Sequence, residues 1–70
     1  MEEIEYNQRV VKIVETLTPK GRAERHEIDE LFMLYNMKFK PRETGKHCAG
    51  CVQRVMTRMT NYYNSIKVNG

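Results

Sequence analysis

The sequence lacks any apolar run that approaches the ~20 residues a helix needs to cross a bilayer. Its opening residues, Met1-Glu2-Glu3, also lack the basic and apolar regions of a secretory signal peptide. Proline and glycine are scarce, with two and four residues, so the composition is not that of a linker or a low-complexity segment. We therefore expect a cytoplasmic or intravirion protein with no place in a membrane.

The chain is also short enough that we expect a single domain, which spans residues 1–70. A chain of this length buries only about 60% of the surface that it exposes when unfolded, so its core is thin and would gain from a metal or a partner subunit. No Ser-His-Asp order and no glycine-rich phosphate loop occurs. We predict that the protein is not an enzyme and has no small-molecule substrate.

Acidic residues are nearly missing from the second half of the chain. Residues 36–70 contain one acidic and seven basic residues, whereas residues 1–35 contain eight acidic and five basic ones. The two halves therefore carry net charges of −3 and +6. This asymmetry indicates that the second half faces an acidic protein surface or a nucleic acid, and the alternative is a solvated basic surface. The candidate contact residues are Lys38, Lys40, Arg42, Lys46, Arg54 and Arg58.

Apolar residues recur at helical spacing in three segments, which predicts helices over about residues 2–17, 22–36 and 48–66. In the first segment the β-branched run of residues 10–14 would also suit a strand, but acidic residues at the start favour a helix, which ends at Thr18-Pro19-Lys20-Gly21. The expected stripes are Tyr6, Val10, Ile13, Val14 and Leu17; then Ile28, Leu31, Phe32 and Tyr35; then Cys48, Val52, Val55, Met59, Tyr62 and Ile66.

These segments predict an all-α fold, a small three-helix bundle with an ordered basic loop between the second and third helices. Stripes centred on Leu31 and Val55 close its interior, and Glu27, Asp29 and Glu30 lie on the other faces of the second helix. That helix is expected to end at Asn36, which tolerates the left-handed conformation. The loop is pinned by Met37 and Phe39, and residues 67–70 form a frayed tail.

The most specific local pattern is Cys48-Ala49-Gly50-Cys51 at the start of the third helix. Three interpretations stay open. Both cysteines are buried apolar thiols on the helix stripe; or they are half of a zinc site completed by His47, His26, a carboxylate or a second chain; or they are a redox pair in which Cys51 resolves a reactive Cys48. The chain is too short for the βαβ framework of a thioredoxin-like protein.

Residues 48–55 resemble the metal-binding loop of heavy-metal-associated copper-transfer domains, in which a CxxC precedes a helix. The resemblance implies a thiolate site suited to Cu(I). It covers eight residues, and only nineteen follow Cys51, which is too few for the rest of that fold. Lys46 and His47 also stand where that family has methionine before the first cysteine. We regard the match as coincidental.

Residues 31–59 resemble short tailed-phage proteins in which a segment like Leu31-Phe32-Met33-Leu34-Tyr35-Asn36 precedes a basic loop and a CxxC helix. This resemblance implies a virion or phage accessory component in the host cytoplasm or the virion.

We expect a non-enzymatic interaction or structural protein that docks on a larger assembly, or on its own copies, through its basic half. The alternatives are a zinc-stabilised module that binds nucleic acid without sequence specificity, and a dithiol redox or copper-handling protein. Residues 37–47 separate the last two helices, a gap longer than the helix-turn-helix turn of about 3 to 4 residues, which argues against sequence-specific DNA reading.

Overall fold

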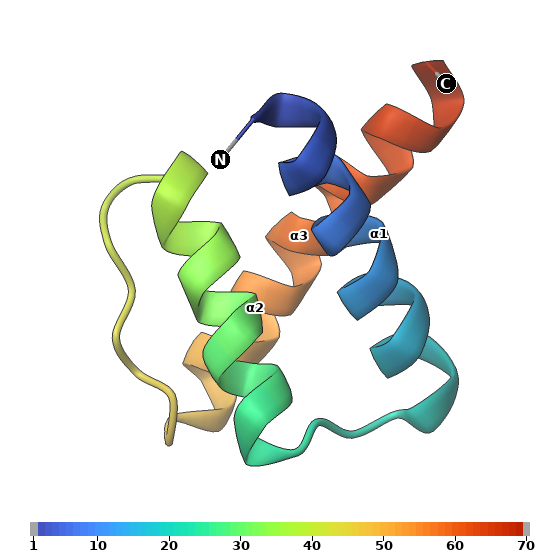
Figure 1. The fold of residues 1–70 in the computed structure, drawn as a ribbon. Helices are drawn as coiled ribbons and strands as arrows, with labels where there is room; N and C mark the ends of the chain where they lie inside the picture. Colours follow the sequence, from blue (N-terminus) through green and yellow to red (C-terminus); the bar gives the residue numbers. More distant parts are fainter. Residues whose placement is uncertain (1, 70) are drawn as a thin grey trace.

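The computed structural model describes residues 2–69, and the side chains of residues 2–67. The described chain forms three helices and no strand: α1 (Glu3–Lys20), α2 (Arg25–Lys38) and α3 (Ala49–Asn69). In Figure 1, α1 and α2 run in roughly opposite directions, α3 crosses behind them, and each helix contacts both others. The predicted three-helix bundle is confirmed. Within residues 2–69 no helix combines the length and apolarity needed to span a membrane.

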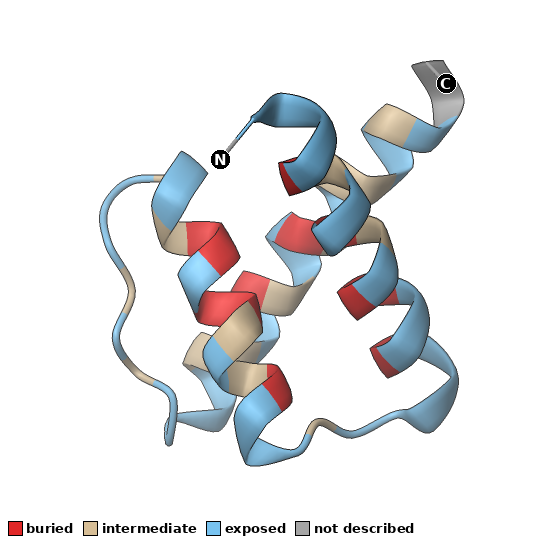
Figure 2. Ribbon diagram, viewed as in Figure 1, coloured by how far each residue is buried: buried red, intermediate tan, exposed pale blue. Residues whose placement is uncertain are grey.

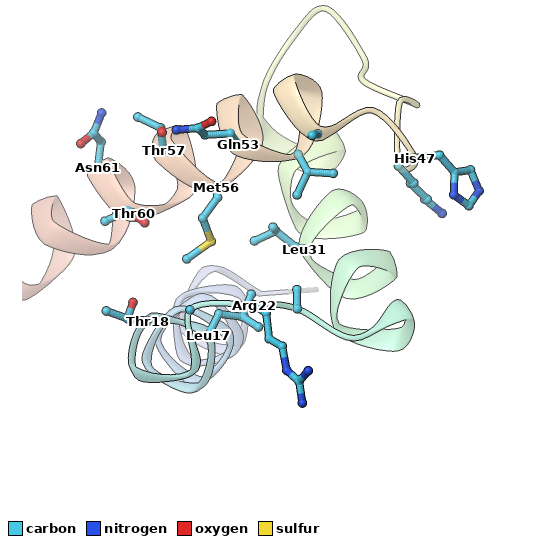
Figure 3. A pocket seen from close by; sticks show the side chains of 15 residues that line it. Leu17, Thr18, Arg22, Leu31, His47, Gln53, Met56, Thr57, Thr60 and Asn61 are labelled. Atoms are coloured by element: carbon cyan, nitrogen blue, oxygen red, sulfur yellow. The ribbon is translucent and has the colours of Figure 1, made fainter.

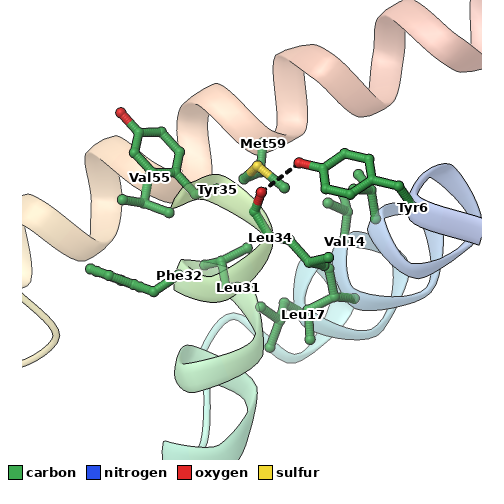
Figure 4. Close-up of a cluster of buried hydrophobic side chains, with 11 residues drawn as sticks. Tyr6, Val14, Leu17, Leu31, Phe32, Leu34, Tyr35, Val55 and Met59 are labelled. Atoms are coloured by element: carbon green, nitrogen blue, oxygen red, sulfur yellow. Dashed lines mark hydrogen bonds between the residues drawn. The ribbon is translucent and has the colours of Figure 1, made fainter. Parts of the chain in front are cut away.

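The core is formed by one stripe from each helix, and these stripes face the centre of the molecule (Figures 2 and 4). The stripes centred on Leu31 and Val55 both point inward, as predicted, and Leu34, which the sequence analysis did not select, is also fully buried. Ile28 is only partly buried. The β-branched run of α1 is helical because the helix period places its apolar side chains in the core. The buried apolar residues are Tyr6, Val10, Ile13, Val14, Leu17, Leu31, Phe32, Leu34, Tyr35, Val55 and Met59.

The first helix ends three residues later than predicted, because Pro19 does not break it. Pro19 lies in the last turn of α1, where a missing N–H removes one hydrogen bond at an exposed helix end. Termination falls to Gly21, whose φ of 71° is the left-handed conformation that favours glycine. Its N–H donates to the Leu17 carbonyl at 3.1 Å.

The second helix begins and ends later than predicted. It starts after a capping box in which Glu24 and Glu27 each accept from the other residue's backbone N–H. Placing Glu27 on a solvent face was wrong, since it is 6% exposed. The prediction that Asn36 ends the helix in a left-handed conformation was also wrong, because α2 continues to Lys38 and no non-glycine residue within 2–69 has a positive φ.

The segment between α2 and α3 is ordered by contacts with both helices. The Phe39 ring stacks on Tyr35 with centroids 5.1 Å apart, as a pinning residue should, whereas Met37 is 52% exposed and does not pin the loop. The third helix continues to Asn69, so the tail predicted over 67–70 is helical as far as that residue. Gly70 lies outside the described residues.

Candidate functional site

The described residues form an open groove of about 730 Å³ between the C-terminal end of α1, the α1–α2 link and the first half of α3 (Figure 3). Its apolar part is formed by Leu17, Leu31, Val52 and Met56. This volume is in the range of pockets that bind small molecules, about 300–1,000 Å³. The other lining residues are Thr18, Gly21, Arg22, Ala23, Lys46, His47, Ala49, Gln53, Thr57, Thr60 and Asn61.

The sequence makes this groove through helix spacing and small side chains. Val52, Met56 and Thr60 are four residues apart and therefore lie along one face of α3. Gly21 and Ala23 in the α1–α2 link carry at most a methyl group, so they leave the space opposite that face unfilled. The groove is thus a space between the helices that their side chains are too small to fill.

Among the described residues, the ionisable side chains that line the groove are all basic. Arg22 and His47 are exposed and form no ion pair with another described side chain, and Lys46 pairs with Asp29 at 3.1 Å. Figure 3 shows His47 at one end of the groove and Arg22 on its rim, extending outward. No carboxylate lines the groove, so its field favours an acidic neighbour.

The six basic residues selected from the sequence do not share one environment. Only Lys46 lines the groove. Lys38 lies over the rings of Tyr6 and Tyr62, 5.1 and 4.8 Å from their centroids, and Arg54 pairs with Glu43 at 3.5 Å. The other three, which form no ion pair with a described side chain, are Lys40, Arg42 and Arg58.

The two cysteines have different environments at the start of α3. Cys48 is exposed at the position before the helix, where its sulfur accepts a hydrogen bond from the Cys51 N–H at 3.3 Å. Cys51 is half-buried beside Gly45. The interpretation that both are buried thiols is therefore wrong for Cys48.

The structure does not bring the four predicted metal ligands together among the described residues. These ligands are Cys48, Cys51, His47 and His26. The one group of three ligands whose atoms lie within 4.8 Å of one another is Glu24, His26 and Glu27, so His26 is grouped with carboxylates and not with Cys48, Cys51 or His47. Glu27 in that group is already bound by Lys20 and by the Glu24 N–H. Two thiols remain, and a zinc site would need ligands from elsewhere.

Sequence reasoning missed the groove, although part of its signal was present. Val52 was placed on the buried stripe of the third helix but lines the groove, as does Met56, which that stripe did not include. Arg22 was read only as the start of a helix, and its place on the rim depends on the turn at Gly21.

Comparison with family models, curated proteins and solved structures found no match for this chain.

Proposed function

We propose that the protein is a non-enzymatic binding protein that holds an acidic, partly apolar polypeptide segment of a larger assembly in the groove between α1 and α3. The observation that carries this proposal is the groove lining: an apolar surface around Met56, flanked by Arg22, Lys46 and His47, with no carboxylate. An amphipathic segment would place its apolar side chains on that surface and its carboxylates toward the rim.

The free energy needed for binding indicates that several apolar side chains of the partner contact the groove. Burying one Leu- or Ile-sized side chain contributes about 1.5–3 kcal/mol, and a micromolar complex needs about 8 kcal/mol. The exposed charges on the rim add little to affinity but direct the approach and orientation of the partner. We therefore expect moderate affinity, with a modest preference for a negatively charged partner.

A polypeptide suits the site better than a nucleic acid. Nucleic acids are bound through rows of cations that neutralise successive phosphates, whereas Arg54 already pairs with a carboxylate and Lys38 lies on tyrosine rings. The resemblance to short tailed-phage proteins makes a phage particle or its assembly intermediate the setting in which we place this partner.

The experiment uses a short helical peptide of leucine and glutamate as the probe, with a leucine–lysine peptide as its counterpart. Backbone amide shifts of the full chain locate the peptide, and a titration gives the dissociation constant. We expect the acidic peptide to perturb residues of the groove such as Val52 and Met56. The basic peptide should bind more weakly.

A matched pair of variants assigns the effect to the groove. Gln53→Glu adds a negative charge at an exposed groove residue of α3, and Gln8→Glu adds the same charge at an exposed residue of α1 outside it. We expect the first to weaken the acidic peptide about two- to fivefold and the second to leave it unchanged. Binding that ignores peptide charge, or that responds equally to both variants, would reject the proposal.

A further inference from the structure

The first turn of α3 carries a pair of nucleophilic side chains that the binding function does not use. Neither Cys48 nor Cys51 lines the groove. We propose that Cys48 and Cys51 form a thiol–disulfide exchange site, in which Cys48 is the attacking thiolate, Cys51 is the resolving thiol and the co-reactant is a low-molecular-weight disulfide. This site goes beyond the proposed binding function and is tested separately from it.

Cys48 has the surroundings of an attacking thiol. Its side chain is exposed, and its carbonyl accepts from the Val52 N–H at 2.9 Å, which places the sulfur at the N-terminal end of the 21-residue helix α3. Hydrogen bonds from the Cys51 thiol, and then from the Cys51 backbone N–H, lower the pKa of Cys48. Burial, and then the charge of Glu43 in the preceding loop, oppose this lowering only in part, and the first turn of α3 has no acidic residue.

Cys51 has the opposite surroundings, which suit a resolving thiol. It is half-buried beneath the loop at Gly45, where a Cβ atom would lie 2.8 Å from its sulfur. The thiol hydrogen bond to Cys48 is the main cause that raises the pKa of Cys51, followed by burial. The exposed sulfur is thus the more acidic of the two, and its half-buried neighbour is the less acidic one.

The exchange needs only these two sulfurs and the external disulfide. The Cys48 thiolate attacks one sulfur of the disulfide, so that a mixed disulfide forms and one small thiolate leaves. Cys51 gives its proton to that released thiolate and then attacks the Cys48 sulfur, which breaks the mixed disulfide and releases the second thiolate. The two cysteines lose two electrons and become one disulfide, and the external disulfide gains them and becomes one thiol and one thiolate.

The geometry favours this chemistry over a metal site. Exchange requires two neighbouring sulfurs, of which one is accessible, and this helix start provides them: Cys48 is exposed, and the Cys51 N–H donates to its sulfur at 3.3 Å. A closed zinc site needs four ligands, and within the described residues no third ligand atom joins the two sulfurs within 4.8 Å.

The test treats the reduced full chain with glutathione disulfide and follows the intact mass. We expect the wild-type chain to lose two hydrogen atoms and to retain no glutathione. Cys51→Ser should stop at a glutathione adduct on Cys48, because the resolving thiol is missing. Cys48→Ser should form its adduct severalfold more slowly, because the remaining thiol, Cys51, is half-buried beneath the loop at Gly45.

A pH profile of alkylation separates a tuned thiol from an ordinary one. In Cys51→Ser, the rate at Cys48 should reach half its maximum below the usual cysteine pKa of about 8.5, and unfolding in urea should return it to that value. Far-UV circular dichroism checks that both variants fold. Equal rates for the two single-cysteine variants, formation of linked dimers only, or zinc retained against a chelator at one ion per chain would each overturn the proposal.

Discussion

At the scale of single residues, the most constrained charge is Glu27. Its carboxylate accepts both hydrogen bonds of Lys20 Nζ, at 2.8 and 2.9 Å, and that of the Glu24 N–H at 2.8 Å. The bond from the Glu24 backbone, and then that from Lys20, lower the pKa of Glu27, while Glu27 raises the pKa of Lys20. One side chain therefore joins the end of α1 to the start of α2.

Glu27→Gln should lower the melting temperature at neutral pH, because the ion pair and its helix cap are weakened. A carboxylate whose folded-state pKa is lowered stabilises the fold above its ordinary value of about 4.3, and this contribution is lost as the pH falls through the folded-state pKa. Thermal unfolding at several pH values should therefore show a difference from wild type that disappears in acid.

Glu30→Gln is the control for that measurement. Glu30 is on the same helix and forms no ion pair with another described side chain, so its substitution should change the melting temperature little at any pH. If Glu27→Gln lowered the melting temperature by the same amount at acidic and at neutral pH, the charge of Glu27 would not be the cause of the stabilisation.

The buried hydroxyl of Tyr6 joins α1 to α2 in a second place, where it donates to the Leu34 carbonyl (Figure 4). Tyr6→Phe should cost about 1 kcal/mol in urea unfolding, the usual contribution of one such hydrogen bond. Burial, and then Tyr62, raise the pKa of Tyr6 to about 12. The contribution of the protonated hydroxyl is complete below pH ~10 and is lost as the pH rises through the folded-state pKa.

Tyr35→Phe provides the comparison, since the Tyr35 ring is buried but its hydroxyl has no hydrogen bond within the described residues. We expect it to change stability much less. Equal costs for the two variants would mean that the Leu34 contact is not the cause.

At the scale of elements, one side chain of α2 forms two hydrogen bonds with the backbone of the loop before α3. The Asn36 amide donates to the Glu43 carbonyl at 2.9 Å and accepts from the Glu43 N–H at 2.8 Å. Glu43 in turn pairs with Arg54 on α3. These contacts fix the segment that covers Cys51.

Asn36→Ala should therefore destabilise the protein by about 1 kcal/mol for each bond lost, and should also expose Cys51. In the Cys48→Ser background, we expect faster alkylation of Cys51 under native conditions. Asn64→Ala, at an exposed position of α3, should change neither quantity. Unchanged alkylation in Asn36→Ala would show that the loop stays in place without this tie.

Helical elements could be predicted from the sequence because apolar periodicity alone sets which face is buried. The ends of the helices could not be predicted in this way, because they depend on individual side chains. Glu24 and Glu27 form the capping box that starts α2. Pro19 lies in the last turn of α1, where it removes only one hydrogen bond and does not end the helix. The cysteine pair was located correctly at a helix start. Its unequal exposure depends on the loop at Gly45, whose path no local pattern specifies.

At the scale of the whole molecule, the charge asymmetry between the halves is partly neutralised by folding. Lys46 pairs with Asp29, and Lys67 with Glu15, so cations of the second half meet acids of the first. Lys38 likewise lies on the Tyr6 ring. The net positive charge is therefore less concentrated in the second half than the sequence indicates. The exposed cations around the groove are the ones that can attract an acidic partner.

The whole fold rests on a core so small that one central side chain should decide whether it forms. A domain of 70 residues has a stability of about 4–10 kcal/mol, and truncating a buried phenylalanine costs about 3–5 kcal/mol. Phe32, which is fully buried between the helices, should therefore be close to indispensable. We expect Phe32→Ala to lose most of its cooperative thermal transition by circular dichroism.

Met33→Ala tests the same helix one residue away, where the side chain is 42% exposed, and should stay within about 0.5 kcal/mol of wild type. The contrast matters because both variants shorten a large apolar side chain to the same methyl group in α2. Helix propensity alone would allow both to fold, since alanine is the best helix former. A cooperatively folded Phe32→Ala would mean that local helix stability, and not the shared interior, holds the three helices together.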